Sequence, residues 1–344
     1  MSLISSTIRV AERGPLPDPL MRMGIGFLVG RTRRKLAAAT DEQEENFARA
    51  MAEHPIAEHA GDANRQHYEL PPGFFALTLG PRRKYSCCLY PTGHETLAEA
   101  ERLALDETVA HAGLADGQSI LELGCGWGSL TLFMAERFPR ASITAVSNSA
   151  QQRLHIEGEA AARGLGNIRV VTADMNAFAP DGTYDRVVSV EMFEHMSNWQ
   201  ALLARVKAWL APQGKLFVHV FSHRHSPYRF DHENEADWIA QHFFTGGIMP
   251  SHNLIRHFPD CFAVERDWRW SGLHYRKTAL NWLERFDANR EQIDRILREI
   301  YGLDAALWRR RWRLFYLATA GLFGHAGGEE WGVSYYLLRP TSSE

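Results

Sequence analysis

Three side chains capable of acid–base chemistry stand together directly after a predicted strand. Glu191 and Glu194 are three residues apart, and Glu191 and His195 are four apart, so one helical turn places all three on one face. Burying two carboxylates and an imidazole is costly unless they have a task. Carboxylates attract an ammonium group, and an imidazole accepts a proton near neutral pH. The cluster therefore predicts a catalytic site, and the alternative is a solvated helix start whose acids the helix dipole favours.

The pattern from residue 119 onward predicts the scaffold that positions this cluster. Short apolar strands are expected at 119–123, 142–147, 168–172, 186–190 and 215–221, and helices at 130–137, 150–162 and 199–210 alternate with them. Such alternation predicts an α/β fold, a mostly parallel Rossmann-like sheet with helices on both faces. Ligands in these sheets bind beyond the carboxyl ends of the strands.

The flanking segments follow another pattern. Residues 1–80 read as helical with polar breaks, helix-forming residues dominate 37–52, and 62–73 is loop-like. A helix at 96–112 opens with a capping box of Thr96 and Glu99. After 221 we expect a loop-rich stretch to 259, helices at 280–301 and 308–323, and a closing strand at 331–338. The sequence therefore predicts an N-terminal helical extension (1–80) and a catalytic domain (81–344), with substrate-pocket segments at about 222–330.

A glycine-rich loop follows the first predicted strand, where Gly124, Gly126 and Gly128 form a GxGxG pattern. Glycines permit a tight turn and a close approach of the backbone to a ligand. The pattern lacks the spacing of a GxGxxG loop, which suits a pyrophosphate, and Glu122 lies two residues before it. Asp174, after the third strand, is placed to accept a hydrogen bond from an adenine amino group, or is a simple turn residue.

Composition narrows the class of protein. Of 344 residues, 38 are Lys or Arg and 41 are Asp or Glu, so the net charge of −3 argues against a nucleic-acid partner. Four cysteines without a paired framework, and no evident signal peptide, predict a cytoplasmic protein. His223, His225 and His232 lack the spacing of a compact zinc site, so we expect no metal.

Six motifs in order carry a family resemblance. They are QHYE at 66–69, KYSCC at 84–88, LELGCGWG at 121–128, SVEMFEHM at 189–196, FFTGGIMPS at 243–251 and GEEW at 328–331. The sequence resembles class I methyltransferases of the cyclopropane fatty acid synthase superfamily, and within it the coclaurine-type N-methyltransferases of benzylisoquinoline alkaloid pathways. The resemblance extends from about residue 66 to residue 339.

The resemblance implies S-adenosyl-L-methionine as cofactor, with S-adenosyl-L-homocysteine as product. Tyr85 and Ser86 would lie over its methionine end, and Gly124 and Gly126 beneath it. Most Rossmann methyltransferases end the second strand with an acidic residue that binds the ribose. In this chain that position is occupied by Ser147, Asn148 and Ser149. The resemblance to the superfamily implies that a hydroxyl residue and a glutamine make this contact instead of an acid. The implied remaining contacts are Ser147, Asn148, Gln152, Asp174 and Met175.

Methyl transfer to an amine suits the acid–base cluster. The displacement is in line, so alignment supplies much of the acceleration. An amine is mostly protonated near neutral pH, so its proton must be removed or shared. We assign Glu191 and Glu194 to holding the amine and His195, polarised by a carboxylate, to accepting the proton.

The main alternative is a lipid enzyme that adds methylene across an alkene of a fatty acyl chain. The resemblance implies that such enzymes hold a bicarbonate ion with residues matching Cys87, Glu194, His219 and Tyr275, and all four types are present. They usually have glycine at the position of Glu191 and isoleucine at that of Phe221. A carboxylate suits an ammonium substrate, whereas in an acyl channel it is an unpaired charge.

The expected partner is a small, aromatic or tetrahydroisoquinoline-like amine, bound in a pocket rich in aromatic residues. Membrane association belongs to the lipid alternative alone, and the oligomeric state, a homodimer included, is open. A sensor that binds S-adenosylmethionine without catalysis is a third alternative, against which the intact Glu191–His195 cluster argues. The predicted substrate-binding residues are Cys87, His219, Phe221, Tyr275 and Trp331.

Overall fold

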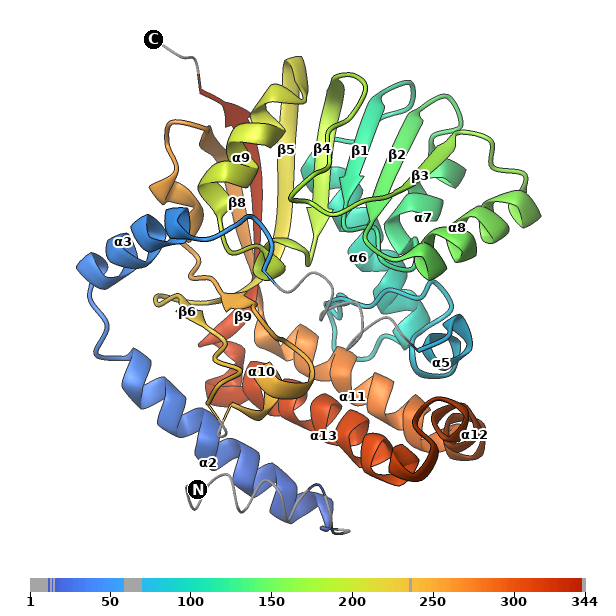
Figure 1. The fold of residues 1–344 in the computed structure, drawn as a ribbon, viewed down its shortest axis with the longest axis vertical. Helices are drawn as coiled ribbons and strands as arrows, with labels where there is room; N and C mark the ends of the chain where they lie inside the picture. The colour runs from blue at the N-terminus through green and yellow to red at the C-terminus, as the bar shows by residue number, and fades with distance from the viewer. Residues whose placement is uncertain (1–11, 13, 15, 59–69, 235–236, 342–344) are drawn as a thin grey trace.

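The computed structural model describes residues 12, 14, 16–58, 70–234 and 237–341, and its centre is a seven-stranded sheet (Figure 1). The strand order is β3-β2-β1-β4-β5-β9-β8. Strands β1 to β5 run parallel, β9 is antiparallel to β5, and β8 pairs antiparallel with β9 at the edge of the sheet. The strands are β1 (Ser119–Leu123), β2 (Ser142–Ser147), β3 (Ile168–Thr172), β4 (Tyr184–Val190), β5 (Leu210–His223), β8 (Phe262–Ser271) and β9 (Trp331–Pro340), with the hairpin β6 (Tyr228–Arg229) and β7 (Ile248–Met249) outside the sheet.

Helices cover both faces of the sheet because neighbouring strand residues point to opposite sides. On β1, Ile120 packs in a cluster with Val109 and Phe133, which belong to α6 and α7. Leu121, the next residue, packs in a second cluster with Leu203 of α9. The helices on the sheet are α6 (Leu97–Ala112), α7 (Ser129–Arg137), α8 (Ala150–Arg163) and α9 (Trp199–Ala208).

A helical layer lies below the carboxyl ends of the parallel strands (Figure 1). Its long helices α11 and α13 pack on each other, and α12 packs on α13. A short helix, α10, lies in front of them in this view (Figure 1). The bounds are α10 (Trp238–His242), α11 (Gly272–Ala288), α12 (Arg290–Tyr301) and α13 (Ala305–Phe323).

Two helices of the N-terminal part pack against this layer. The N-terminal part comprises α2 (Asp18–Leu36), α3 (Asp41–Ala50) and α5 (Pro72–Thr78), of which α3 contacts the turn Leu254–His257 instead. Helix α2 lies on α13, and α5 contacts α11 and α12. Arg313 of α13 is held by Asp18 and Asp287, so this basic helix is engaged in internal ion pairs. A division of the chain at residue 80 stays a prediction.

The predicted α/β fold is confirmed, and the capping box of Thr96 and Glu99 begins α6. The stretch 222–259 is loop-rich, as predicted, with the short elements β6, α10 and β7, and the helix-forming stretch 37–52 contains α3. Three features differ from the prediction. Strand β8 was not expected. The helix expected at 280–301 is interrupted at Asn289 between α11 and α12, and the helix expected to reach residue 210 ends at Ala208.

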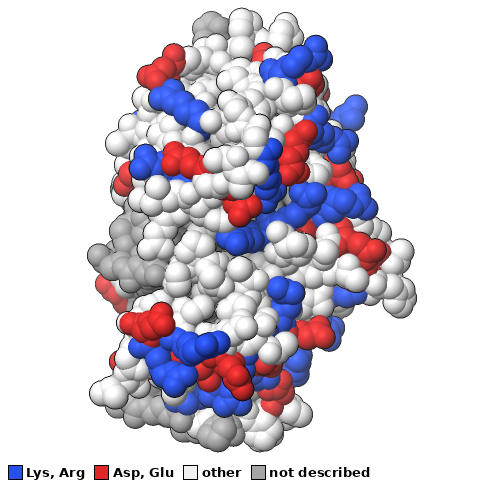
Figure 2. Space-filling model, turned by 90° about the vertical axis from the view of Figure 1, so that its right-hand side faces the viewer, with Lys and Arg blue, Asp and Glu red and all other residues white. Residues whose placement is uncertain are grey.

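Charge is distributed without a large field of one sign on the face that Figure 2 shows, where basic and acidic side chains are interspersed. Elsewhere in the described ranges, exposed pairs such as Arg163 with Glu136 and Glu159 bridge neighbouring helices and turns. Among the helices that the structure describes, none has the length and apolar content that crossing a bilayer requires.

Gly272 offers a test of the contact between the helical layer and the sheet. A Cβ added there would collide with the backbone carbonyl oxygens of Phe323 and Trp331, which cannot move aside as a flexible side chain does. We expect Gly272→Ala to lower the free energy of unfolding by about 2–3 kcal/mol in urea titrations.

The matched control is Gly158→Ala on the exposed surface of α8, where an added Cβ meets nothing within 4 Å. The free energy of unfolding of that variant should rise by about 0.5–1 kcal/mol, because alanine is a better helix former than glycine. Equal stability of the two variants would contradict the predicted contact.

Candidate active site

The glycine-rich loop forms the floor of the candidate site, between β1 and α7. Gly124 and Gly126 have φ values of +78° and +52°, the left-handed region that favours glycine. A Cβ at Gly124 would collide with the Met192 side chain, whereas one at Gly126 would point into open space. The loop therefore packs against the acidic segment on one side and leaves its backbone accessible on the other.

Two cavities meet over this loop, and Gly124, Gly126, Gln152 and Glu191 line both of them. Tyr85 and Ser86 line one cavity. The residues predicted to contact the nucleoside end line the other, namely Ser147, Asn148, Asp174 and Met175, together with His195. The structure thus brings all nine predicted cofactor-binding residues to one crevice at the carboxyl ends of the strands. Their individual contacts with a cofactor stay predictions.

The end of β2 carries a preorganised polar pair. The Ser147 hydroxyl donates to Gln152 Oε1 at 2.6 Å and accepts the Ser149 backbone N–H at 3.0 Å. The amide Nε2 of Gln152 is buried and has no hydrogen-bond partner in the described part of the chain, and the same holds for Ser129 Oγ, another residue of the crevice. Buried polar atoms of this kind require a partner, so the crevice fits a polar ligand such as a nucleoside with an amino-acid tail.

Asp174 makes the hydrogen bonds of a turn residue and also lines the crevice, and its contact with an adenine stays a prediction. Its Oδ1 accepts hydrogen bonds from the backbone N–H and side-chain amide of Asn176, as in a turn. The residue is exposed and lines the cavity next to the buried Met175. At the other end of the crevice, burial raises the pKa of Glu122 to about 8, and Thr131 donates to that carboxyl group at 2.5 Å.

Glu191 is held by three donors from distant parts of the chain. Its Oε1 accepts the backbone N–H of Cys87 at 2.8 Å and lies 3.1 Å from Nε2 of His219. Its Oε2 accepts the Tyr275 hydroxyl at 2.6 Å. A carboxylate only accepts, so His219 carries its proton on Nε2. The structure therefore brings together three of the predicted substrate-binding residues around the first residue of the acidic cluster.

The backbone of Glu191 is strained. Its φ is +50°, which a residue with a side chain rarely adopts. Such strain costs about 1–3 kcal/mol and persists where the surroundings fix it. Here the hydrogen bonds to the carboxylate fix it, so Glu191 is not a solvated helix start, and its catalytic role stays a prediction. The turn that follows is the single 3₁₀ turn Phe193–His195.

The cluster holds its groups in different charge states. Burial opposes ionisation of Glu191, but the hydrogen bonds from His219 and Tyr275 and the charge of Lys84 outweigh it and lower its pKa. Burial, together with the charge of Glu191, raises the pKa of Glu194 well above its ordinary value. Burial also lowers the pKa of His195 and of His219 to about 4 each, so both imidazoles are neutral near pH 7.

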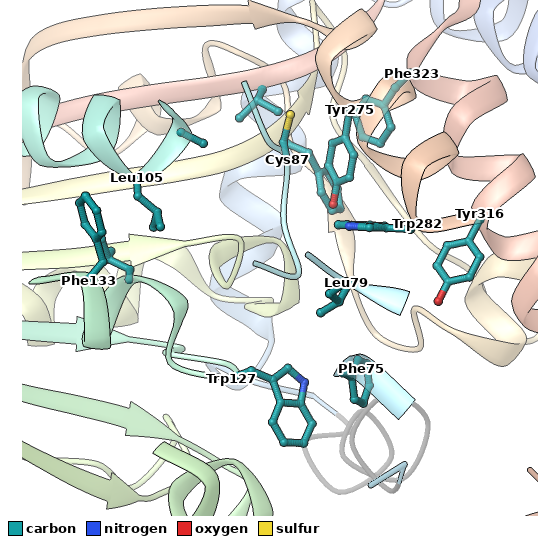
Figure 3. Close-up of a cluster of buried hydrophobic side chains, with 14 of the residues drawn as sticks. Phe75, Leu79, Cys87, Leu105, Trp127, Phe133, Tyr275, Trp282, Tyr316 and Phe323 are labelled. Atoms are coloured by element: carbon teal, nitrogen blue, oxygen red, sulfur yellow. The ribbon is translucent and has the colours of Figure 1, made fainter. Parts of the chain in front are cut away.

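Aromatic rings pack around the cluster. Phe244 lies 4.4 Å from His195 and 5.4 Å from Phe221, centroid to centroid. Tyr275 stacks on Phe323 at 4.3 Å (Figure 3). These contacts bring Phe221 and Tyr275 near the cluster, and their role in substrate binding stays a prediction.

Trp331 lies farther away than the other predicted substrate residues. It pairs with His223 across β5 and β9, whereas His219 pairs with Tyr335, four residues along the strand. Its Nε1 donates to the Tyr228 hydroxyl at 3.2 Å, and its ring is fully buried. The structure does not bring Trp331 to Glu191, and its role in binding stays a prediction.

Sequence reasoning missed the contribution of the N-terminal part to the crevice. Ala57 and Glu58 line the cavity beside Asp174. Asn176 fixes Ala57 through both its backbone N–H and its carbonyl, and Glu58 accepts the Ser197 hydroxyl at 2.8 Å. No motif marks these residues, because their partners are more than 100 positions away.

Two expectations have no structural counterpart to report. The QHYE motif at 66–69 lies outside the described residues. Over the described ranges, no group of three His, Cys, Asp or Glu side chains comes together in a way that would hold a metal ion.

Comparison with known proteins decides the family. The model of the mycolic acid cyclopropane synthetase family matches residues 57–325. The chain belongs to this family. It is an S-adenosylmethionine-dependent methyltransferase, as the resemblance implied. (S)-Coclaurine N-methyltransferase of Thalictrum flavum subsp. glaucum is 34% identical over 98% of the chain and 96% of its own length. Cyclopropane-fatty-acyl-phospholipid synthase of Escherichia coli K12 is 29% identical over 64% of the chain and 56% of its own length.

Solved structures support the same assignment. A coclaurine N-methyltransferase bound to N-methylheliamine and SAH superposes with a TM-score of 0.94 at 32% identity, over 98% of this chain and all of that one. The cyclopropane synthase MmaA2 of Mycobacterium tuberculosis has a TM-score of 0.68 at 21% identity, over 84% of this chain and all of that one, and shares the fold. The described residues fit S-adenosylmethionine as cofactor.

Glu194 gives a prediction for the pH dependence of stability. In the unfolded chain its carboxyl ionises near the ordinary pKa of 4.5, whereas the folded protein keeps it protonated to much higher pH. Stability from this group is therefore present below pH 4.5 and is lost as the pH rises, by up to about 1.4 kcal/mol per pH unit. Glu194→Gln removes this loss, so the free energy of unfolding of the variant should increase relative to that of the wild type between pH 5 and pH 8.

Urea unfolding of the cofactor-free protein at both pH values measures the effect. The exposed Glu157 of α8 supplies a control, because Glu157→Gln should follow the wild type at each pH. A constant difference between Glu194→Gln and the wild type would show that Glu194 is ionised in the folded protein.

Proposed function

We propose that the protein methylates the nitrogen of a small aromatic or tetrahydroisoquinoline-like amine. The relatives over nearly the full chain are named N-methyltransferases of alkaloid amines, and pavine N-methyltransferase of Thalictrum flavum subsp. glaucum is a further one, at 30% identity. The geometry around Glu191 adds a physical reason that is independent of these names.

The observation that carries the proposal is the position of the Glu191 carboxylate. In the lipid alternative, groups matching Cys87, His219 and Tyr275 help to hold a bicarbonate ion. Here the backbone N–H of Cys87, His219 and the hydroxyl of Tyr275 already donate to the carboxylate of Glu191. A tethered carboxylate takes the place of a free anion, so the site supplies its own negative charge.

Glu191 then provides the binding charge for a substrate ammonium. A carboxylate has about four acceptor positions. Cys87 and His219 use those of Oε1, and Tyr275 uses one on Oε2, which leaves one position on Oε2 for an amine N–H. Because this charge is buried, an ammonium ion that pairs with it offsets the desolvation of both groups.

Glu194 and His195 flank this charge. The Glu194 carboxyl is neutral in the absence of substrate, and its oxygens have no hydrogen-bond partner in the described part of the chain. An arriving cation favours its ionisation, so Glu194 supplies a second acceptor for the amine. His195 is neutral and electrostatically linked to Glu191, so the unprotonated nitrogen of its imidazole is suited to accept a proton from the amine.

The cofactor supplies an electrophilic methyl group on a sulfonium. The residues of this chain orient the acceptor: Glu191 lines both cavities of the cofactor crevice, and its carboxylate also accepts the hydroxyl of Tyr275, which we assign to the acceptor region. The rings of Phe221 and Phe244 offer apolar contact and, for a cationic ligand, about 0.5–2 kcal/mol per well-placed face. The reaction is a displacement in which alignment and a free lone pair matter most.

A methyl-transfer screen tests the proposal. Tetrahydroisoquinolines, phenethylamines and tryptamines are incubated with the cofactor and the protein, beside vesicles of unsaturated phospholipid, and products are identified by mass spectrometry. We expect N-methylated product from at least one amine class and no gain of methylene by the lipid. Modification of the lipid alone would overturn the proposal in favour of the lipid alternative.

Removal of the Glu191 carboxylate should make turnover depend on a free carboxylate or bicarbonate ion. Glu191→Gly opens the three-donor position, and relief of the strained φ offsets part of the stability that is lost with the three hydrogen bonds. We expect turnover of the best amine to fall by 100-fold or more and to recover at least 10-fold with added bicarbonate or formate.

Glu191→Gln is the matched control, because its amide fills the position and blocks a free anion. It should be inactive and gain nothing from added anions. Rescue of both variants alike by added anions would contradict the role given to Glu191. Full activity of the glycine variant, with rescue of neither variant, would also contradict it.

A further inference from the structure

Lys84 is a buried lysine that the proposed chemistry does not use. It precedes the Tyr85–Ser86 pair, and only 2% of its surface is exposed. Its ammonium donates to the Ser86 hydroxyl and, at 2.8 Å, to the carbonyl oxygen of Cys87. Lysine is rarely buried to this extent unless it is paired.

The surroundings of Lys84 contain acids but no ion pair. Glu101 of α6 accepts the backbone N–H groups of Arg82 and Lys84 at 2.9 and 3.1 Å, so it fixes the backbone of this turn. Neither Glu101 nor Glu191 forms a salt bridge with the Lys84 ammonium in the described structure. Burying an ammonium on neutral partners costs several kcal/mol, which a function must justify.

The hydrogen bond from Lys84 to Ser86 indicates what that function is. Because the Ser86 oxygen accepts from the ammonium, its own O–H points elsewhere. Ser86 lines the crevice with Tyr85, Gly126 and Gln152. A hydroxyl that is polarised by a neighbouring positive charge is a strong donor to an anion.

We propose that Lys84 is a positioning residue for the cofactor, which acts through the Ser86 hydroxyl to bind the α-carboxylate at the amino-acid end of S-adenosylmethionine. Its charge lies behind the donor, so the carboxylate gains electrostatic stabilisation without a direct salt bridge. The nearby Glu191 gains from the same charge, which helps to keep it ionised. The inference concerns the cofactor and holds whichever acceptor the enzyme methylates.

The test compares two ligands that differ at the amino-acid end. S-adenosylhomocysteine carries the carboxylate, whereas 5′-methylthioadenosine keeps the adenosine and thioether but lacks the amino-acid group. Their dissociation constants are measured by isothermal titration calorimetry for the wild type and Lys84→Met, which has a similar length and no charge. We expect Lys84→Met to weaken S-adenosylhomocysteine at least 10-fold and to change 5′-methylthioadenosine less than twofold.

The intact affinity for 5′-methylthioadenosine shows that the variant is folded. Arg82→Met is the matched control, since it removes a positive charge two residues away that pairs with Glu136 at the surface, and it should leave both constants unchanged. Equal weakening of both ligands by Lys84→Met would show a merely structural role and overturn the proposal.

A second comparison keeps the proposal testable if Lys84→Met does not fold. Ser86→Ala alone should weaken S-adenosylhomocysteine at least 10-fold and change 5′-methylthioadenosine less than twofold, since the charge acts through the hydroxyl. Unchanged binding of S-adenosylhomocysteine to Ser86→Ala would contradict the proposal. The measurements need no acceptor amine, so a failed methylation screen leaves their outcome unaffected.

Discussion

The site depends on one interaction, the capture of the Glu191 carboxylate by three donors. The Cys87 N–H, His219 and Tyr275 come from a loop, strand β5 and helix α11, so the carboxylate ties the sheet to the loop before α6 and to the helical layer. This anchoring holds Glu191 at a φ that its side chain disfavours. A buried charge and a strained backbone persist together because each hydrogen bond offsets part of their cost.

Other features of the crevice follow from this arrangement. The segment that carries Glu191 places Met192 against Gly124, so the acidic turn and the glycine loop share one packed contact. The negative charge of Glu191 favours the protonated form of Glu194. The proposed site combines a fixed carboxylate, a neutral acid and a neutral base beside a cofactor crevice, which suits an amine that arrives as an ammonium ion and loses its proton better than an acyl chain.

Much of the fold and of the cofactor crevice could be predicted from the sequence, because strand alternation and the glycine loop are local patterns. Strand β8 escaped prediction since it is an edge strand with charged residues and a register shift near Val264, and its pattern lacks alternation. The break at Asn289 lies within a continuous helical pattern. Glu191 was recognised by its spacing, and its donors were named as substrate-binding residues, but their contact with Glu191 was not predicted, because Cys87 is 104 positions away and contributes its backbone N–H. Lys84 belongs to the KYSCC motif, but its burial gave no signal, and neither did Glu58, since both arise from the packing of distant segments.

The most direct test of whether the Glu191 carboxylate takes the place of a free anion is the dependence of wild-type turnover on bicarbonate. N-methylation of the best tetrahydroisoquinoline is followed in buffer stripped of carbon dioxide and in the same buffer with bicarbonate restored. Because Glu191 already occupies the donors, the account predicts equal initial rates in both. A rate that collapses without bicarbonate and returns on its addition would contradict it.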